Sequence, residues 1–215
     1  MTSDLCLVSG GVDSTIMAMQ YPQATRVFID FGQPYAEREK KALNGLFGST
    51  YQTITVRNKL DKESELSDIF IPSRNLFLAS LVVVKFKPDR VLIAGLGDDY
   101  VVDKNPDAFE HMSEILTRFS GKPITVYSPF FGFTKGSLVE SFLESSSDKN
   151  EARITLEKTY SCYSGEEKPC MDCPACFRKF VALASNGIFN KQSIPSDRII
   201  KEYLQKLHTY NPERI

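Results

Sequence analysis

The chain has 215 residues, with 26 basic and 27 acidic side chains and a formal net charge of −1. Hydrophobic residues make up 42% and charged residues 25%, which excludes a largely disordered chain, because disorder requires few apolar residues and a high net charge. This length suits one domain, or one domain with a small appendage. The balanced charge also argues against a protein whose main task is to wrap nucleic acid.

Membrane and secretory features are not expected. No apolar run approaches the roughly 20 residues that cross a bilayer. Residues 1–4 lack the basic start and long apolar core of a secretory signal. These features predict a soluble, cytoplasmic protein without a membrane partner.

Strands and helices are expected to alternate over the first 127 residues. In chain order we predict strands at 5–8, 26–30, 51–56, 90–94 and 124–126, and helices at 13–21, 35–46, 76–86 (buried) and 107–119. This alternation predicts an α/β fold with a doubly wound, mostly parallel sheet and helices on both faces. In such sheets ligands bind beyond the carboxyl ends of the strands, here after Val8, Asp30 and Ala94.

The character of the chain changes at about residue 136. A helix rich in Ser and Glu is expected at 137–144, followed by a polar run at 145–150 that predicts a linker or an exposed loop. Further helices are expected at 177–184 and 197–207. The second part of the chain is therefore predicted to be a small helical segment.

A short motif between the first strand and the first helix has the properties of a phosphate-binding loop. It reads Ser9-Gly10-Gly11-Val12-Asp13-Ser14-Thr15. The glycines let backbone N–H groups surround a phosphate, and the helix N-terminus favours an anion. The hydroxyls of Ser9 and Ser14 can donate to phosphate oxygens, whereas Asp13 is suited to hold Mg²⁺ or to orient the loop. The motif resembles the PP-loop of the ATP pyrophosphatase superfamily, whose members adenylate a substrate oxygen.

Four of the five cysteines gather in one short stretch. They are Cys162, Cys170, Cys173 and Cys176. Four clustered thiolates in a chain without a secretory signal favour structural Zn²⁺ over disulfides, and they leave no open position for a catalytic water. An iron–sulfur cluster uses the same ligands and stays open as an alternative. Cys6, which stands alone, is expected to pack in the first strand.

Together these motifs resemble those of the 7-cyano-7-deazaguanine synthase family, the PP-loop branch that makes the nitrile precursor (preQ0) of queuosine and archaeosine. The similarity includes residues 9–15, 31–33, Glu37, 72–75, 128–130, 134–135, 159–163 and the three cysteines that follow. One segment, 97–109, departs from the family. There Pro106, Asp107 and Phe109 match, but the Cys-Arg pair of the family is missing.

The resemblance implies an ATP-dependent C–N ligase that converts 7-carboxy-7-deazaguanine and ammonia into 7-cyano-7-deazaguanine, through adenylated intermediates and 7-amido-7-deazaguanine. It implies ATP and Mg²⁺ as cofactors beside structural Zn²⁺, with ATP bound by residues 9–15 and by Gln33. No direct contact with nucleic acid is expected, and the assembly is left open, with a homodimer as one option. The implied organisation is a PP-loop nucleotide-binding α/β domain (1–135) and a C-terminal helical segment with the zinc site (136–215).

The resemblance also implies a catalytic set of Asp13, Ser14, Arg74 and Lys135. The two cations are suited to stabilise charge that develops on a phosphate or a carboxylate. Arg74 could instead lie on a helix surface, and Lys135 could be a solvated lysine at a helix start.

Arg74, Asn75 and Asp107 form the predicted substrate site. A carboxylate such as Asp107 can accept two hydrogen bonds from the N–H edge of a guanine-like base. Asp107 could equally be an ordinary acidic residue of a helix N-terminus. The two histidines, His111 and His208, are expected in surface or packing roles.

Other functions remain open at this stage. One is an enzyme that stops at 7-amido-7-deazaguanine, because the departing segment 97–109 belongs to the expected base site. Others are a PP-loop protein that thiolates RNA and one that modifies or binds a partner. RNA thiolation would need a basic RNA-binding face, which the net charge of −1 does not favour.

Overall fold

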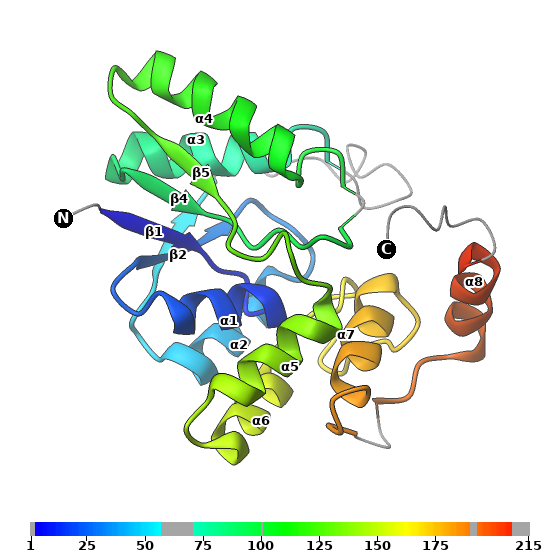
Figure 1. Cartoon of the computed structure of the whole chain (residues 1–215). Coiled ribbons are helices and arrows are strands. Elements are labelled where there is room, and N and C mark those ends of the chain that lie inside the picture. Colours follow the sequence, from blue (N-terminus) through cyan, green and yellow to red (C-terminus); the bar gives the residue numbers. More distant parts are fainter. Residues whose placement is uncertain (1–2, 57–70, 100, 190–192, 208–215) are drawn as a thin grey trace.

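The computed structural model describes residues 3–56, 71–99, 101–189 and 193–207. Within these ranges the centre of the molecule is a five-stranded parallel sheet in the order β3-β2-β1-β4-β5 (Figure 1). The strands are β1 (Asp4–Leu7), β2 (Thr25–Asp30), β3 (Gln52–Thr55), β4 (Arg90–Leu92) and β5 (Thr125–Tyr127). The predicted doubly wound parallel sheet is confirmed.

Helices cover both faces of this sheet. The helices of the described residues are α1 (Val12–Gln20), α2 (Ala36–Phe47), α3 (Arg74–Phe86), α4 (Pro106–Ser120), α5 (Lys135–Ser145), α6 (Lys149–Lys158), α7 (Pro174–Ala184) and α8 (Asp197–Leu207). Helices α3 and α4 lie on one face, whereas α1, α2, α5 and α6 gather on the other (Figure 1). Among the described residues, no helix is long and apolar enough to span a membrane.

Alternate side chains of the strands supply two hydrophobic clusters, because successive side chains of a strand point to opposite faces. Cys6 and Phe28 belong to the cluster that includes α1 and α5, and Leu5 and Val27 belong to the cluster with α3 and α4. A sheet buried on both faces explains why its central strands are continuous apolar runs in the sequence. Burial raises the pKa of the Cys6 thiol to about 12, and its predicted packing role is confirmed.

Two predictions for the helices were wrong in detail. The polar run 145–150 is not one loop, because α6 begins at Lys149, where the Asp148 side chain accepts hydrogen bonds from the N–H groups of residues 150 and 151. Helix α6 was not predicted; it packs through Ala152 and Leu156 into the cluster of α1. Helix α3 was expected to be buried, but only one side is: Ala79 is fully buried and Val84 is exposed.

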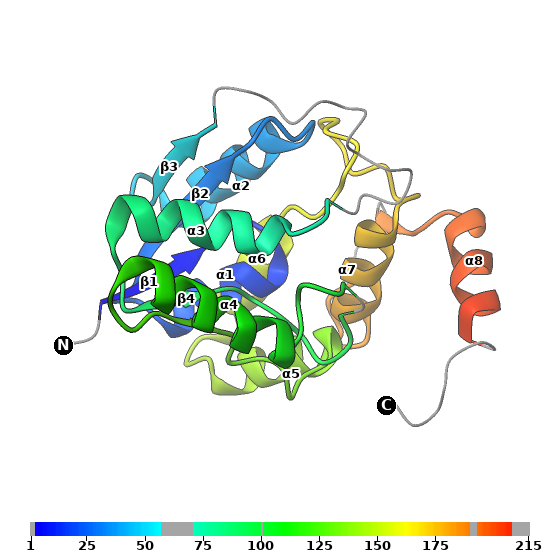
Figure 2. The ribbon, with the colours of Figure 1, turned by 90° about the horizontal axis from the view of Figure 1, so that it is seen from above.

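The order of the strands creates a switch point between β1 and β4. The chain moves outward from β1 to β2 and β3 on one side, and to β4 and β5 on the other. A crevice at the carboxyl ends of such neighbours is the usual ligand site of an open α/β sheet. Helix α7 lies beyond this end of the sheet, with α8 outside it (Figure 2). Helices α5 and α6 share a hydrophobic cluster with α1, and the division of the chain after residue 135 stays a prediction.

Candidate active site

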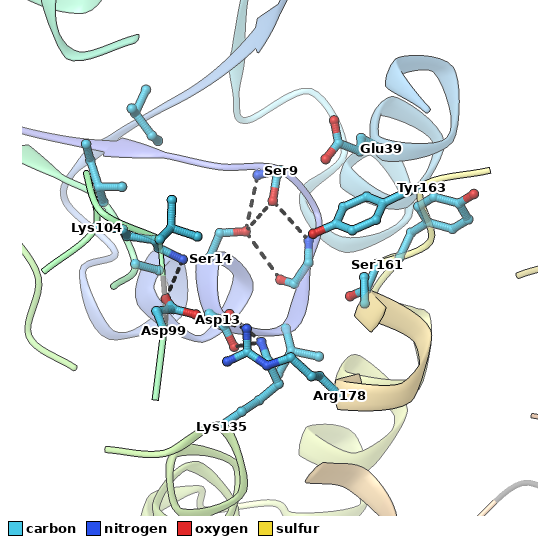
Figure 3. Close-up of a pocket in the computed structure, with 18 of the residues that line it drawn as sticks. Ser9, Asp13, Ser14, Glu39, Asp99, Lys104, Lys135, Ser161, Tyr163 and Arg178 are labelled. Carbon is cyan, nitrogen blue, oxygen red and sulfur yellow. Dashed lines mark hydrogen bonds and ion pairs between the residues drawn. The ribbon is translucent and has the colours of Figure 1, made fainter. Parts of the chain in front are cut away.

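A cavity of about 1010 Å³ opens at the switch point. The predicted site residues among its lining are Ser9, Gly11, Val12, Asp13, Ser14, Gln33, Arg74, Asn75, Lys135 and the predicted metal ligand Cys162. Segments far apart in the sequence complete its wall, notably Asp98, Asp99, Val101 and Lys104, residues 160–163 and the first turns of α7 (Figure 3). The structure therefore brings most of the predicted set to one place.

The loop after β1 is shaped to receive an anion. Gly10 has φ +71°, and a Cβ there would lie 3.1 Å from the Cβ of Ala42, so both conformation and space require glycine. Gly11 is the N-cap of helix α1 and offers no side-chain cap, which leaves the first-turn N–H groups available to a ligand. The hydroxyls of Ser9 and Ser14 lie 3.2 Å apart at this turn (Figure 3).

Two predicted loop residues lie behind the cavity wall. Gly10 packs against α2, and its carbonyl oxygen accepts a hydrogen bond of 2.8 Å from the N–H group of Tyr160. Thr15 is fully buried in α1, and in the described part of the chain its hydroxyl has no hydrogen-bond partner. Neither Gly10 nor Thr15 lines the cavity, so both residues support the loop from the side of the core.

Asp13 and Lys135 form an ion pair at the N-terminus of α1 (Figure 3). Only 16% and 14% of the two side chains are exposed, so Lys135 is not a solvated lysine at a helix start. Its position is fixed by a capping box, in which Thr134 Oγ1 accepts from the N–H group of Ser137 and the Thr134 N–H group donates to Ser137 Oγ. A cation is thus held where phosphate charge is expected.

Buried Gln33 and half-buried Glu39 form a polar pair on the opposite side of the loop. Gln33 Oε1 accepts from the N–H group of Phe31 at 3.0 Å, and Gln33 Nε2 donates to Glu39 Oε2 at 2.9 Å. Burial raises the pKa of Glu39 to about 8, although the Gln33 hydrogen bond and the charge of Arg74 act in the opposite direction. Sequence reasoning missed Glu39, because the charged helix around it resembles a solvent-exposed one.

The predicted substrate residues separate in the structure. Asn75 is buried at the cavity wall, where its amide Nδ2 donates to Asp103 Oδ1 at 3.0 Å and ties α3 to the segment after β4. Arg74 lines the cavity beside it. Asp107 does not line the cavity: its side chain is 85% exposed, because Asn105 caps α4 and the first turn faces outward.

His111 is also exposed, and its Nδ1 lies 3.8 Å from Asp107 Oδ1, so a surface role is confirmed for this histidine. Glu37 is likewise exposed and pairs with Lys40. His208 and Tyr100, which belongs to the departing segment, lie outside the described residues.

Asp99 organises a charged cluster that sequence reasoning missed. It is 4% exposed, and it accepts hydrogen bonds from the Leu96 N–H group at 3.1 Å and from Arg178 Nη1 at 3.0 Å. Lys104 Nζ lies 2.7 Å from Asp99 Oδ2, the oxygen that also accepts from Leu96. Burial alone would raise the pKa of Asp99, but the charges of Lys104 and Arg178 prevail and lower it to about 2. No local pattern relates residue 99 to residue 178, because only the fold brings them together.

The four clustered cysteines form a candidate metal centre. Their sulfur atoms all lie within 4.8 Å of one another. Tetrahedral Zn²⁺ with Zn–S bonds of about 2.3 Å places sulfurs about 3.8 Å apart, so a small contraction completes the site. Cys162 Sγ accepts from the N–H groups of Cys170 (3.3 Å) and Ser164 (3.4 Å), and such bonds stabilise metal-bound thiolates. The cluster can hold a metal such as zinc.

The cysteine-bearing segment packs against the loop after β2. Gly165 has φ +73°, and a Cβ there would lie 2.5 Å from the carbonyl oxygen of Pro34. Arg38 Nε donates to the Gly165 carbonyl oxygen at 3.1 Å, and the rings of Tyr35 and Tyr163 lie 5.5 Å apart. The metal centre and the cavity thus share one wall.

A parallel sheet with a glycine loop at its switch point, beside a four-thiol centre, defines an α/β protein of the PP-loop class with an additional metal site. The family model described as "Queuosine biosynthesis protein QueC" matches residues 44–187, which include all four cysteines. The chain belongs to this family, and the resemblance found in the sequence is confirmed.

Curated relatives match over most of the chain. A protein of Persephonella marina named 7-cyano-7-deazaguanine synthase is 27% identical over 87% of this chain and 94% of its own length. Proteins with the same name from Pseudoalteromonas translucida (24% identical, 87% of this chain, 97% of the relative) and Prochlorococcus marinus (27%, 81% and 90%) are similar along their length. The family match includes the metal centre, and the alignments with these three relatives cover 81–87% of this chain.

Proposed function

We propose that the protein is a cytoplasmic 7-cyano-7-deazaguanine synthase, an ATP-dependent C–N ligase that acts on 7-carboxy-7-deazaguanine and ammonia without a nucleic-acid partner. The observation that carries the proposal is the uncapped N-terminus of α1 with the half-buried Asp13–Lys135 pair, in a cavity walled by the four-cysteine segment. Relatives that align over most of the chain bear this enzyme's name.

The chemical problem is that a carboxylate is a poor electrophile. In the proposed first step, a carboxylate oxygen of the base attacks the α-phosphorus of ATP, and pyrophosphate departs. Ammonia then attacks the activated carbonyl carbon, AMP leaves with the oxygen, and the amide forms after loss of a proton. A second ATP activates the amide oxygen in the same way, and loss of AMP and two protons gives the nitrile.

The protein's part in these steps is positioning and charge stabilisation. The first-turn N–H groups of α1 and the ammonium group of Lys135 would stabilise negative charge on the departing pyrophosphate. Asp13 would hold Mg²⁺, which offsets phosphate charge when bound, and the carboxylate would then leave Lys135. Arg74 is the cation on the side of Glu39 and Asn75, where it would meet the carboxylate of the base.

Gln33 is assigned a supporting role. Its amide already bonds Phe31, Ile29 and Glu39, so it would fix the wall beside the nucleotide through the backbone. The four-cysteine centre would be structural, because all four ligand positions of a tetrahedral ion are filled by sulfur.

Mass spectrometry of the products tests the proposal. Purified protein is incubated with ATP, Mg²⁺, ammonium and 7-carboxy-7-deazaguanine, and we expect the nitrile with two molecules of pyrophosphate released per molecule formed. Omission of the base should abolish pyrophosphate release. Release that is unchanged without the base would contradict the proposal and favour a PP-loop protein that modifies RNA or a protein partner.

A second candidate is an enzyme that releases 7-amido-7-deazaguanine. Two features of the segment 97–109 favour it. The family's Cys-Arg pair is absent, and Asp107, which comes just before the position of that pair, points to solvent. A neutral amide gains less than a carboxylate from Arg74 and Lys135, so the second activation depends more on contacts with the base. A time course separates the candidates, because steady accumulation of amide supports the second and conversion to nitrile without free amide excludes it.

A further inference from the structure

Arg178 reaches the cavity from the helix that carries two of the clustered cysteines. Cys173 is the N-cap of α7 and Cys176 lies in its first turn, two residues before Arg178. The Arg178 guanidinium lies beside Asp13 and Lys135, at the N-terminus of α1 (Figure 3). A cation from the metal-bearing segment thus faces the turn where an anion is expected to bind.

The guanidinium is held by the segment that follows β4. Arg178 Nη1 donates to Asp99 Oδ1 at 3.0 Å, and Nη2 donates to the Asp98 carbonyl oxygen at 3.5 Å and lies 3.4 Å from Asp98 Oδ1. Within the described part of the chain, these bonds use two of its five N–H donors. The arginine is therefore oriented by protein groups and keeps donors for a ligand.

Basic and acidic side chains around the cavity form ion pairs, so their charges are balanced. Lys104, Arg178 and Lys135 pair with the carboxylates of residues 99, 98 and 13, and Arg74 and Glu39 also line the cavity. Most of these side chains are shielded from water, and an unpaired charge is costly in such a shielded place. When a polyanion with its Mg²⁺ binds, Lys135 would pair with the polyanion in place of Asp13, while Asp99 would continue to hold Arg178 in place.

We infer that Arg178 binds the phosphate groups that the α1 N-terminus also binds, that Asp98 and Asp99 position it, and that the four-cysteine centre fixes the helix turn from which it extends. Arg74 is less suited to this role, because its charge acts on Glu39, which lies away from Asp13 and Lys135 in Figure 3. A planar guanidinium can bond two phosphate oxygens at once, whereas an ammonium group acts as a point charge.

The metal centre matters here because the first turn of α7 has few apolar contacts, whereas Lys179, Ala182 and Leu183 anchor the later turns to residues 157–159 and to the core. Of the eleven residues of α7, only Cys176, Ala182 and Leu183 are buried. The ring of Phe177 packs on Tyr203 of α8, with centroids 4.3 Å apart, which is a contact on the outer side. Loss of the metal should therefore release Arg178 from the cavity, while the sheet and the loop after β1 remain folded.

Calorimetric titration with inorganic pyrophosphate in the presence of Mg²⁺ tests the inference, which rests on the proposed function. We expect Arg178→Met to retain about one zinc per chain and to bind pyrophosphate at least tenfold more weakly, with a shallower salt dependence. Arg178→Lys should be intermediate. The control is Arg153→Met, because Arg153, on α6, donates to the Gly187 carbonyl oxygen and does not line the cavity.

Two results would overturn the inference. One is pyrophosphate affinity in Arg178→Met within twofold of the wild type, and the other is absence of pyrophosphate binding by the wild type. If Arg178→Met loses its metal, Arg178→Lys decides, since unchanged affinity with bound zinc contradicts the bidentate contact and a threefold loss supports it. Chelation of zinc from the wild type should weaken binding as much as Arg178→Met does, and unchanged affinity there refutes the coupling to the metal centre.

Failure of the proposed function would look different. A wild-type protein that binds pyrophosphate but forms neither amide nor nitrile contradicts the proposed reaction and leaves the comparison of Arg178 variants valid. Asp99→Asn adds a readout for positioning: we expect a weaker affinity for pyrophosphate and a raised KM for ATP, with kcat and zinc content little changed. A parallel fall in zinc content would indicate a merely structural role for Asp99.

Discussion

The two walls of the cavity are built on different physical principles. Helix α1, behind the glycine loop, buries six of its nine residues, and Ile16 and Met17 are fully enclosed in the core. Helix α7, in the opposite wall, buries three of its eleven residues and depends on a thiol cluster and on ion pairs with Asp98 and Asp99. The first wall belongs to the hydrophobic core of the sheet along most of its helix, whereas the second joins that core only through Ala182 and Leu183 and is otherwise held by polar contacts and the thiol cluster.

This difference separates folding from ligand binding. Apolar burial stabilises the first wall whether or not a metal is present. In the second wall, the free energy of metal binding is also the free energy of local folding. Changes in the two walls should therefore leave different signatures in metal content, stability and turnover.

The largest effect is expected from Cys173→Ser. Removal of one thiolate should abolish zinc binding and unfold the second wall, because the segment has little core of its own. Metal analysis should fall from about one zinc per chain to none, and hydrogen exchange should quicken across residues 159–189 but not in β1 and β2. Cys6→Ala is the control that keeps the metal, and a bound iron chromophore in anaerobic wild-type protein would contradict the zinc assignment.

A loss of turnover without a loss of structure is expected from Asp13→Ala. The variant removes the group proposed to hold Mg²⁺, and we expect ATP-dependent turnover to fall by roughly 10²-fold or more. Ser14→Ala should act in the same direction. Zinc content and the melting temperature should change little, in contrast to Cys173→Ser. Near-normal turnover in both variants, with exposed Glu37→Ala as the control, would remove this loop from the site.

The wall beside the loop should show a pH signature through Glu39. Its pKa is raised to about 8 by burial, so between about pH 4.5 and 8 the unfolded chain is ionised while the folded protein keeps the proton. Stability should therefore fall as pH rises through this window, by a few kcal/mol in total. In Glu39→Gln the decline should be flatter when urea unfolding is followed from pH 5 to 8. An equally steep decline in the variant would contradict the assignment.

The second wall should show a smaller signature of opposite sign. The pKa of Asp99 is lowered to about 2, so its ion pairs contribute stability that is present above about pH 4 and is lost as the pH falls to about 2. The contribution is about 2 kcal/mol. Asp99→Asn should lose this acid-dependent part in unfolding experiments between pH 2 and 5, whereas Asp107→Asn, at an exposed site, should retain it.

The same contrast explains what the sequence could predict. The strands, the glycine loop and the four cysteines are local patterns, and the structure places them together as expected. Helix α6 escaped prediction because only Ala152 and Leu156 are buried in a polar stretch. Asp99 and Arg178 are 79 residues apart, and no local spacing relates them.

Glu39 and Asp107 illustrate how local chemistry misleads. Both are acids near helix starts, and each could have been solvated or functional on sequence grounds. The structure half-buries Glu39 against Gln33 and turns Asp107 to water, because the orientation of a helix in the fold decides which of its faces is covered. The orientation of each helix about its own axis is set by tertiary packing, which a local stretch of sequence does not contain.

The order of the walls along the chain has a consequence for biosynthesis. The last strand of the sheet ends at Tyr127, whereas the second wall begins at Tyr160 and ends beyond Arg178. A ribosome adds about 5–20 residues per second, so the far wall is made roughly 2–10 s after the sheet is complete. During that interval a nascent chain could form the glycine loop with one side open, and a product truncated there would display half of a binding site.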